Sequence, residues 1–211
     1  MTKHDDITAL ILAAGYSSRM GRFKPLLPLG PITVLERTVQ LFRDAGIDDV
    51  RVVVGYRAQD LVPLMRRLGV RWSVNEHFQE GMLSSIKAGL HTLEASKKAF
   101  FLLPVDIPLV RPGTVIDLLH ACGKHDADVL YPCFRGKRGH PPLIDAALHS
   151  GILSWSSEGG LRSFLEQHQN RAVNVEVADE HILLDMDTPA QYEDMCRRLK
   201  HDEILSSDKC Q

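Results

Sequence analysis

The sequence has few cysteines and no long apolar run. None of its four cysteines (Cys122, Cys133, Cys196 and Cys210) belongs to a C-x-x-C pair, so neither a zinc site nor a disulfide framework is predicted. No apolar stretch approaches the ~18 residues that a transmembrane helix needs, and the first residues are too polar for a signal peptide. These absences favour a cytoplasmic protein that has no membrane span.

An excess of positive charge is also missing. The 211 residues contain 25 Lys and Arg against 27 Asp and Glu, which gives a formal net charge of −2. The chain therefore lacks the broad basic field that attracts nucleic acid or anionic membranes. Any binding of phosphate groups has to depend on a few local Arg and Lys side chains and on backbone amides.

Apolar runs and amphipathic segments alternate along the first two thirds of the chain. Strands are expected over 7–13, 50–54, 70–74, 100–105 and 128–134, and helices over 34–45, 59–68, 82–93 and 115–121. This alternation predicts a three-layer α/β/α fold, in which a mainly parallel, Rossmann-like sheet is covered by helices on both faces.

The last third is less regular. Segment 139–144 contains Pro141 and Pro142, and we expect it to be extended but not a central strand. Helices are expected over 158–169 and 190–199, and short strands over 173–177 and 182–184. Because no repeat or linker is present, the sequence predicts one domain over 1–200, followed by a flexible tail over 201–211.

A loop of small and basic residues follows the first expected strand. In a parallel sheet, ligands bind at the carboxyl ends of the strands, and small residues let the backbone approach a ligand closely. Backbone amides, hydroxyls and cations together predict a triphosphate site. The residues concerned are Leu12, Ala13, Ala14, Gly15, Ser17, Ser18, Arg19 and Lys24. The alternative is a surface turn whose charges are incidental.

Three carboxylates are candidate metal ligands. Asp106 ends the most apolar strand between two prolines, and Mg²⁺ is typically bound by one or two carboxylates together with substrate phosphates. Asp185 and Asp187 would lie on one face of a strand, and either could complete the site with Asp106. The alternatives are that Asp106 caps the helix near Pro112 and that Asp187 caps the last helix beside Thr188.

Together these segments resemble the nucleotidyltransferases of the molybdenum cofactor, and the cytidylyltransferase branch more closely than the guanylyltransferase branch. The resemblance extends over residues 7–197. It is carried by the first loop (residues 12–24), Gly81-Met82-x-Ser84-Ser85, Asp106-Ile107-Pro108, Gly139-His140-Pro141, Gly159-Gly160-x-Arg162 and Asp185-Met186-Asp187-Thr188-Pro189. The Ala13-Ala14-Gly15 sequence and its spacing to Lys24 favour the cytidylyl branch.

The resemblance implies a glycosyltransferase-A type fold and transfer of CMP from CTP to the phosphate of molybdopterin, with release of pyrophosphate. It assigns catalysis to Arg19, Lys24 and Asp106. It places the nucleotide against the first loop, Gly81, Ser84 and Ser85, Mg²⁺ on Asp106 with Asp185 or Asp187, and the acceptor near His140 and Arg162.

The expected partners are CTP or another NTP, a molybdopterin-type acceptor and a client molybdoenzyme. The alternative functions are a guanylyltransferase, a sugar- or alditol-phosphate nucleotidyltransferase, and a non-catalytic maturation factor for molybdoenzymes.

Overall fold

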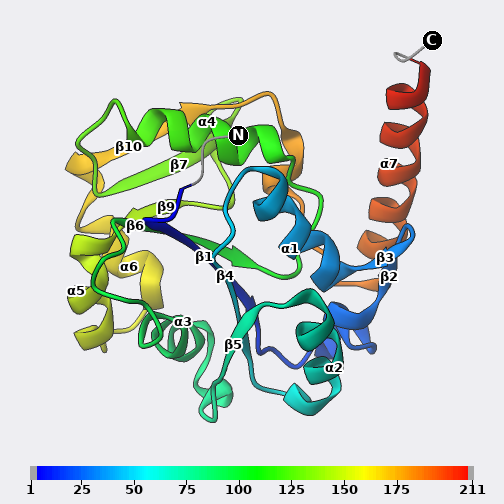
Figure 1. Cartoon of the computed structure of the whole chain (residues 1–211), viewed down its shortest axis with the longest axis horizontal. Coiled ribbons are helices and arrows are strands. Elements are labelled where there is room, and N and C mark those ends of the chain that lie inside the picture. Colours follow the sequence, from blue (N-terminus) through cyan, green and yellow to red (C-terminus); the bar gives the residue numbers. More distant parts are fainter. Residues whose placement is uncertain (1–3, 209–211) are drawn as a thin grey trace.

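Eight strands form the main sheet in the computed structural model, which describes residues 4–208 (Figure 1). The order is β10-β7-β9-β6-β1-β4-β5, with β8 paired to β7, and only β8 and β9 run antiparallel to their neighbours. The bounds are β1 Ile7–Ala13, β4 Val50–Val54, β5 Arg71–Val74, β6 Ala99–Pro104, β7 Val129–Phe134, β8 Lys137–Arg138, β9 Leu143–Asp145 and β10 Ala172–Glu176. A separate hairpin joins β2 (Pro28–Leu29) to β3 (Ile32–Thr33).

Helices cover both faces of this sheet and create two apolar cores. Strand β1 is buried along its whole length; Ala9 and Ile11 pack into one core and Leu10 and Leu12 into the other, as alternation along a strand requires. The predicted three-layer, mainly parallel α/β fold is therefore confirmed.

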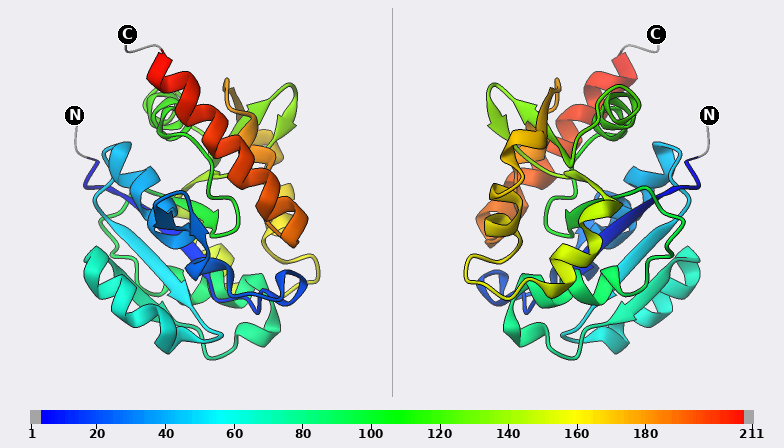
Figure 2. Two further views of the ribbon diagram at one scale, coloured as in Figure 1. Left: turned by 90° about the vertical axis from the view of Figure 1, so that its right-hand side faces the viewer. Right: turned by 90° about the vertical axis from the view of Figure 1, so that its left-hand side faces the viewer.

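Two groups of helices make the outer layers. One face carries α1 (Val34–Asp44), α2 (Ala58–Leu68), α4 (Pro112–Cys122) and α7 (Pro189–Asp208), and the other carries α3 (Met82–Leu90), α5 (His149–Ser154) and α6 (Gly160–Glu166). Helix α7 runs along the outside of the first layer (Figure 2) and contributes Met195 and Leu199 to its core. Short 3₁₀ helices η1 (Ser18–Met20), η2 (Lys24–Leu26), η3 (Phe78–Glu80), η4 (Ala146–Leu148), η5 (Gln169–Arg171) and η6 (Glu180–Leu183) occupy connections.

The segment with two prolines supplies a central strand, contrary to the prediction. Leu143 pairs with Phe101 of β6 on one side and with Leu130 of β7 on the other. Pro141 and Pro142 lie just before β9, where their missing N–H groups leave the ladder intact. The prediction was wrong because the restriction that the two prolines impose does not extend to the residues after them.

Two other expectations in the last third fail. Residues 182–184 were expected as a strand, but they belong largely to η6, because the Asp179 side chain accepts a hydrogen bond from the His181 amide and closes a turn. Helix α6 begins only at Gly160, later than expected, because Gly159 and Gly160 both have a positive φ, of 87° and 63°, and helical backbone angles can start only after them.

The C-terminal helix is longer than expected. Helix α7 continues to Asp208, into the segment that was predicted to be a flexible tail, and residues 200–208 contain neither proline nor glycine to end it. Residues 209–211, which include Cys210, lie outside the described residues. The thiols of Cys122, Cys133 and Cys196 are free.

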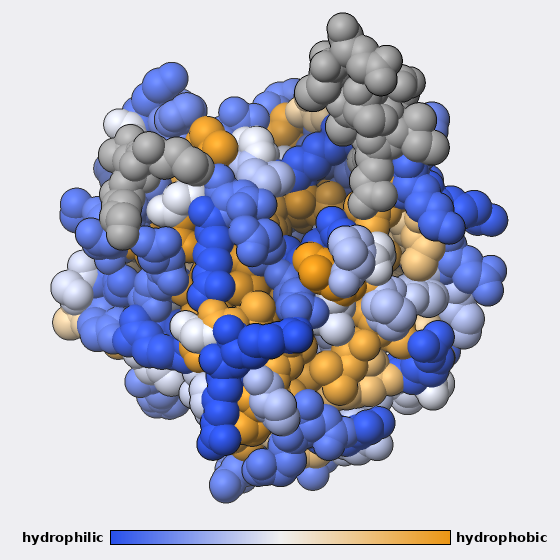
Figure 3. Space-filling view, turned by 45° about the vertical axis from the view of Figure 1, so that its right-hand side comes forward, coloured by the Kyte–Doolittle hydropathy of each residue, from blue (hydrophilic) through white to orange (hydrophobic). Residues whose placement is uncertain are grey.

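Polar side chains cover most of the face shown in Figure 3, and apolar groups lie in the hollows between them. Of the helices described over residues 4–208, none has the length and apolar character to cross a membrane.

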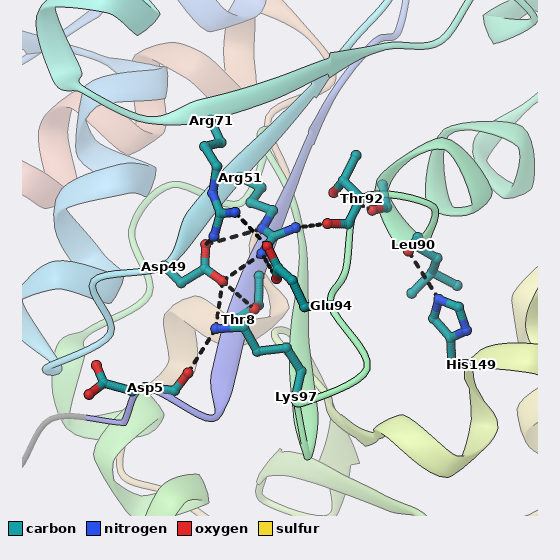
Figure 4. Close-up of polar contacts among 11 residues, drawn as sticks. Asp5, Thr8, Asp49, Arg51, Arg71, Leu90, Thr92, Glu94, Lys97 and His149 are labelled. Atoms are coloured by element: carbon teal, nitrogen blue, oxygen red, sulfur yellow. Dashed lines mark hydrogen bonds and ion pairs between the residues drawn. The ribbon is translucent and has the colours of Figure 1, made fainter.

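A charged network joins the strands at the edge of the sheet where they begin (Figure 4). Its centre is the carboxylate of Asp49, just before β4, which accepts hydrogen bonds or ion pairs from Thr8 Oγ1 at 2.7 Å, Lys97 Nζ at 2.8 Å, Arg71 Nη2 at 2.6 Å and Arg51 Nη2 at 2.9 Å. These partners come from β1, β4, β5 and the segment before β6, so the network ties together the starts of four adjacent strands.

Arg51 is the most buried charged member of this network. Only 2% of its surface is exposed, and its guanidinium also contacts the carbonyl of Thr92 and the carboxylate of Glu94. A buried cation of this kind is tolerated only because carboxylates compensate its charge.

The network shifts the pKa values of its carboxyl groups. Burial by itself would raise the pKa of Asp49, but hydrogen bonds from Arg51, Lys97 and Thr8 outweigh burial and hold the pKa far below its usual range. Hydrogen bonds from Arg51 and Arg71 lower the pKa of Glu94 to about 2. A carboxyl whose pKa is lower in the folded state stabilises the fold above its unfolded pKa of about 4, and this contribution is lost as the pH falls further.

Replacement of Asp49 tests this contribution. We expect Asp49→Asn to lower the free energy of unfolding by about 2–4 kcal/mol at pH 7, because Arg51 and Lys97 lose their shared partner. Urea denaturation at a series of pH values should also show a weaker loss of stability between about pH 5 and 2 than in the wild type.

The matched control is Asp126→Asn. Asp126 pairs with Arg171 at 3.0 Å, but its side chain is 92% exposed, so the expected loss is below about 0.5 kcal/mol. Equal losses in the two variants would contradict the structural role of the Asp49 network.

Candidate active site

Two loops meet where β1 and β6 end. The strands are paired neighbours, with Leu12 opposite Pro104, and the Val105 amide donates to the Leu12 carbonyl at 3.0 Å. Their loops therefore leave the sheet side by side, one toward the glycine-containing segment and the other toward Asp106. This edge is the place where parallel α/β sheets bind ligands.

A cavity of about 340 Å³ opens between these loops, and we call it the loop cavity. Most of the predicted nucleotide-binding residues line it: Leu12, Ala13, Ala14, Gly15, Ser17, Lys24, Gly81 and Ser85, together with Asp106. Ser18, Arg19 and Ser84 are not among its lining residues. Ser18 is exposed at the start of η1, so of the two loop serines only Ser17 lines the cavity.

Gly15 leaves space on the cavity side of the loop. A Cβ added there would meet no protein atom within 4 Å, and Gly15 is not among the residues with a positive φ. Neither packing nor backbone conformation in the described chain therefore requires glycine. The remaining physical reason is room for a ligand close to the backbone.

The turn after Gly15 brings Lys24 inward. Ser17 adopts a left-handed conformation with a φ of 57°, and its hydroxyl accepts a hydrogen bond from the Lys24 amide at 3.2 Å. Strain of this type costs about 1–3 kcal/mol and is concentrated at functional sites. As a result only 8% of Lys24 is exposed, although lysine is a residue type that is seldom buried without a partner.

The Lys24 ammonium lies between two of the predicted metal ligands. Its Nζ is 3.0 Å from Asp106 Oδ2 and 2.7 Å from Asp187 Oδ1. The exposed guanidinium of Arg19 lies 2.8 Å from the other oxygen of Asp187. The hydrogen bond from Lys24 is the main cause of the lowered pKa of Asp187. Residues predicted separately as phosphate ligands and as metal ligands thus form one cluster.

Asp185 lies apart from this cluster. Its carboxylate accepts a hydrogen bond from Gln191 Nε2 at 2.9 Å. The prediction placed Asp185 and Asp187 on one face of a strand, but residues 184–188 are not a strand. The loop instead turns Asp187 toward Lys24, while the Met186 amide donates to the Asp106 carbonyl at 2.9 Å.

Other residues cap the two nearby helices. Thr188 and Gln191 exchange hydrogen bonds at the start of α7, with the Thr188 amide donating to Gln191 Oε1 at 2.9 Å. Asp179 accepts from the Arg111 amide at 2.8 Å and from Thr114 Oγ1 at the start of α4. Asp106 and Asp187 are therefore not needed as helix caps, and their carboxylates remain directed at Lys24.

The cluster fits a divalent cation. One oxygen of Asp106 and one of Asp187 lie within 3.0 Å of the same ammonium nitrogen, so both are aimed at one point that already holds positive charge. Among residues 4–208, no group of three or more His, Cys, Asp or Glu side chains could hold a metal by itself. Two carboxylates completed by substrate phosphates suit Mg²⁺, which keeps few protein ligands.

Asn75 is a site residue that the sequence analysis missed. It follows β5, is only 4% exposed, and its Nδ2 donates to Ser84 Oγ at 2.8 Å and Ser85 Oγ at 3.0 Å. Ser84 also donates to the carbonyls of His77 and Gly81, so it orders the turn before α3 and Ser85 faces the loop cavity. The sequence does contain one signal for it, because Asn75 directly follows the strand that was expected over 70–74.

A second cavity, which we call the side cavity, adjoins the first. It has a volume of about 610 Å³ and shares Met82 and Pro104 with the loop cavity. Both predicted acceptor residues, His140 and Arg162, line it. Part of its wall is apolar and is formed by Ile86, Leu102, Pro142, Leu161 and Leu165. The other lining residues are Gly139 and the polar residues Tyr131, Arg138, Glu166 and Gln169.

His140 is held by its backbone. Its amide donates to the carbonyl of Ile182 at 3.0 Å, and a Cβ at Gly139 would overlap that carbonyl, which explains the glycine at this position. Burial lowers the pKa of His140, although the charge of Asp106 opposes the shift. Burial therefore favours the neutral form of the imidazole. Arg162 differs, because its exposed side chain pairs with Glu166 at 3.1 Å one helical turn away.

Comparisons with known proteins agree with this geometry. Residues 9–173 match the family model of the MobA-like NTP transferase domain. The nicotine blue oxidoreductase of Paenarthrobacter nicotinovorans is 32% identical over 193 residues, covering 88% of this chain and 94% of that protein. The molybdenum cofactor cytidylyltransferase of Escherichia coli (strain K12) is 27% identical over 189 residues, covering 88% of this chain and 93% of that protein.

A solved structure is also similar. Rv0371c from Mycobacterium tuberculosis H37Rv has a TM-score of 0.81 and 25% identity, and the match covers 93% of this chain and 100% of that one. The family match includes the loop after β1, Lys24 and Asp106, whose contacts are described above. The chain belongs to the MobA-like NTP transferase domain family of nucleotidyltransferases.

Proposed function

We propose that this protein transfers CMP from CTP to the phosphate of a molybdopterin-type acceptor and releases pyrophosphate. The observation that carries the proposal is the convergence of Lys24, Asp106 and Asp187. Lys24 and Asp106 line the loop cavity, which adjoins the side cavity at Met82 and Pro104. A nucleotidyltransferase needs positive charge and a cation site at the reacting phosphates, and this cluster offers both beside the loop cavity.

The triphosphate would lie along the loop cavity. Backbone amides of residues 14–18 can donate to phosphate oxygens, as loops at the ends of parallel strands do. Lys24 and Arg19 carry the charges that would hold the triphosphate. The Arg19 side chain is exposed, and it would exchange its ion pair with Asp187 for the phosphates. Asp106 and Asp187 would hold Mg²⁺, which supplies charge neutralisation at the phosphates when bound.

The acceptor would occupy the side cavity. Its apolar wall, which includes Ile86 and Leu165, suits the ring system of a pterin-type molecule, while Arg162 offers a cation for an anionic group. His140 would contact the acceptor as a neutral hydrogen-bonding group, because burial lowers its pKa. The acceptor phosphate oxygen would attack the α-phosphorus directly, so that no covalent enzyme intermediate forms.

A second candidate function comes from the relative of greater identity. The Paenarthrobacter nicotinovorans protein, at 32% identity, is named as an oxidoreductase of nicotine blue. The side cavity, with its apolar wall, could hold such an aromatic molecule. Bleaching of nicotine blue in the presence of a reduced nicotinamide nucleotide, without any pyrophosphate release, would favour this second candidate.

Substitution of the three acidic residues tests the cation site. We expect Asp106→Asn and Asp187→Asn each to lower kcat/KM for pyrophosphate release by about 10²–10³-fold, because each removes a carboxylate that would hold the cation. Asp185→Asn is the matched control, since that carboxylate pairs with Gln191, and it should retain activity within about threefold. If Asp185→Asn is inactive and Asp187→Asn is active, the metal-ligand assignment is wrong.

A comparison of nucleotides tests the choice of base. With a molybdopterin-type acceptor and Mg²⁺, CTP should give a kcat/KM at least about tenfold higher than GTP, because base discrimination of this size needs only one or two hydrogen bonds. The same assay with sugar and alditol phosphates as acceptors separates the related alternatives. A preference for GTP would assign the protein to the guanylyl branch. No release of pyrophosphate with any combination of nucleotide and acceptor would favour a non-catalytic maturation factor.

A further inference from the structure

Lys24 occupies the position that a metal ion would need. Its side chain is 9% exposed, and its Nζ contacts one oxygen of each candidate ligand, Asp106 and Asp187, at 3.0 and 2.7 Å. The two carboxylates come from segments that lie 82 and 163 residues from Lys24 in sequence. Without a cation between them they would repel each other, so the ammonium holds the site together.

An ammonium and a divalent cation cannot share these oxygens without strong repulsion. Carboxylate oxygens bind Mg²⁺ at about 2.1 Å, which would leave the cation only a few ångströms from an unmoved Nζ. Like charges at about 4 Å interact strongly even in a partly screened site. The ammonium therefore has to leave when the cation binds.

The loop cavity offers Lys24 another partner. Lys24 lines this cavity beside Gly15 and Ser17, so a triphosphate bound there would present oxygens within reach of its flexible side chain. Arg19 differs, because it contacts the outer oxygen of Asp187 and is 71% exposed, so that its charge is screened by solvent. Lys24 is thus the cation whose departure opens the site.

We propose that Lys24 is a resident counter-ion that competes with the divalent cation for Asp106 and Asp187, so that the cation binds strongly only when a triphosphate draws the ammonium away. This inference rests on the proposed function for the identity of the ligands. Coupling of this kind is reciprocal, since each ligand favours the other to the same extent. It would keep the nucleotide-free protein from holding a metal ion.

The competition is measurable with Mn²⁺ alone, followed by the electron paramagnetic resonance of the free ion. We expect Lys24→Met to bind Mn²⁺ at least about tenfold more tightly than the wild type at pH 8, because the competing charge is removed. Lys24→Gln, which keeps a neutral donor for the carboxylates, should show the same direction of change. Lys87→Met is the matched control, because Lys87 donates to the Trp155 carbonyl, and it should leave Mn²⁺ affinity unchanged.

A double variant shows where the extra affinity arises. Addition of Asp187→Asn to Lys24→Met should abolish the gain, whereas addition of Asp185→Asn should not. An Mn²⁺ affinity for Lys24→Met equal to or weaker than that of the wild type would overturn the proposal, as would a gain that survives Asp187→Asn. If either Lys24 variant unfolds, Mn²⁺ should restore its fold in place of the ammonium, and failure to do so also counts against the proposal.

These measurements contain neither nucleotide nor acceptor. Their outcome is therefore independent of pyrophosphate release by the wild type, which tests the proposed function. A nucleotidyltransferase in which Lys24→Met does not tighten Mn²⁺ binding would keep its function and lose only the counter-ion role of Lys24.

Discussion

The contact of one lysine with two aspartates connects the parts of this site. Lys24, Asp106 and Asp187 come from three distant segments, and each would be unfavourable alone, since a buried ammonium and two adjacent carboxylates all need compensation. Together they compensate each other. The turn at Ser17, the end of β6 and the loop before α7 must all be in place for the contact to form, so the contact is possible only in the complete fold.

The sheet makes that contact possible. The pairing of β1 with β6 places two loops at one edge, and the Asp49 network fixes the opposite ends of the same strands. The charged groups at the two edges have different roles. At the edge where the strands begin, the carboxylate of Asp49 is paired with three cations and joins the strands to one another. At the edge where they end, Lys24 and Asp106 line the loop cavity, where a triphosphate and a cation could bind.

Local patterns predicted the parts of the fold that depend on local chemistry. The expected strand over 7–13 matches β1 residue for residue, because a short, almost wholly apolar run is typical of a strand that is buried on both faces of a sheet. The loop after it and Asp106 were expected at one edge of the sheet for the same reason. The side cavity is lined by both His140 and Arg162, although their separation in the sequence did not indicate how close they lie in the fold.

Features set by tertiary contacts were not predictable in this way. Strand β9, which follows the two prolines, is central because it pairs with β6 on one side and with β7 on the other. Asp187 reaches Lys24 because the segment before it forms η6 instead of a strand. The role of Asn75 depends on two serines that approach it from α3. In each case the deciding partner lies in another element, and no local pattern records it.

A crystal structure of the protein with CTP and Mn²⁺, with the metal located by its anomalous scattering, tests the central claim most directly. The account predicts one metal peak between the carboxylates of Asp106 and Asp187, with the Lys24 ammonium moved from both onto the triphosphate in the loop cavity. A metal bound elsewhere, with Lys24 still in contact with both aspartates, would contradict it.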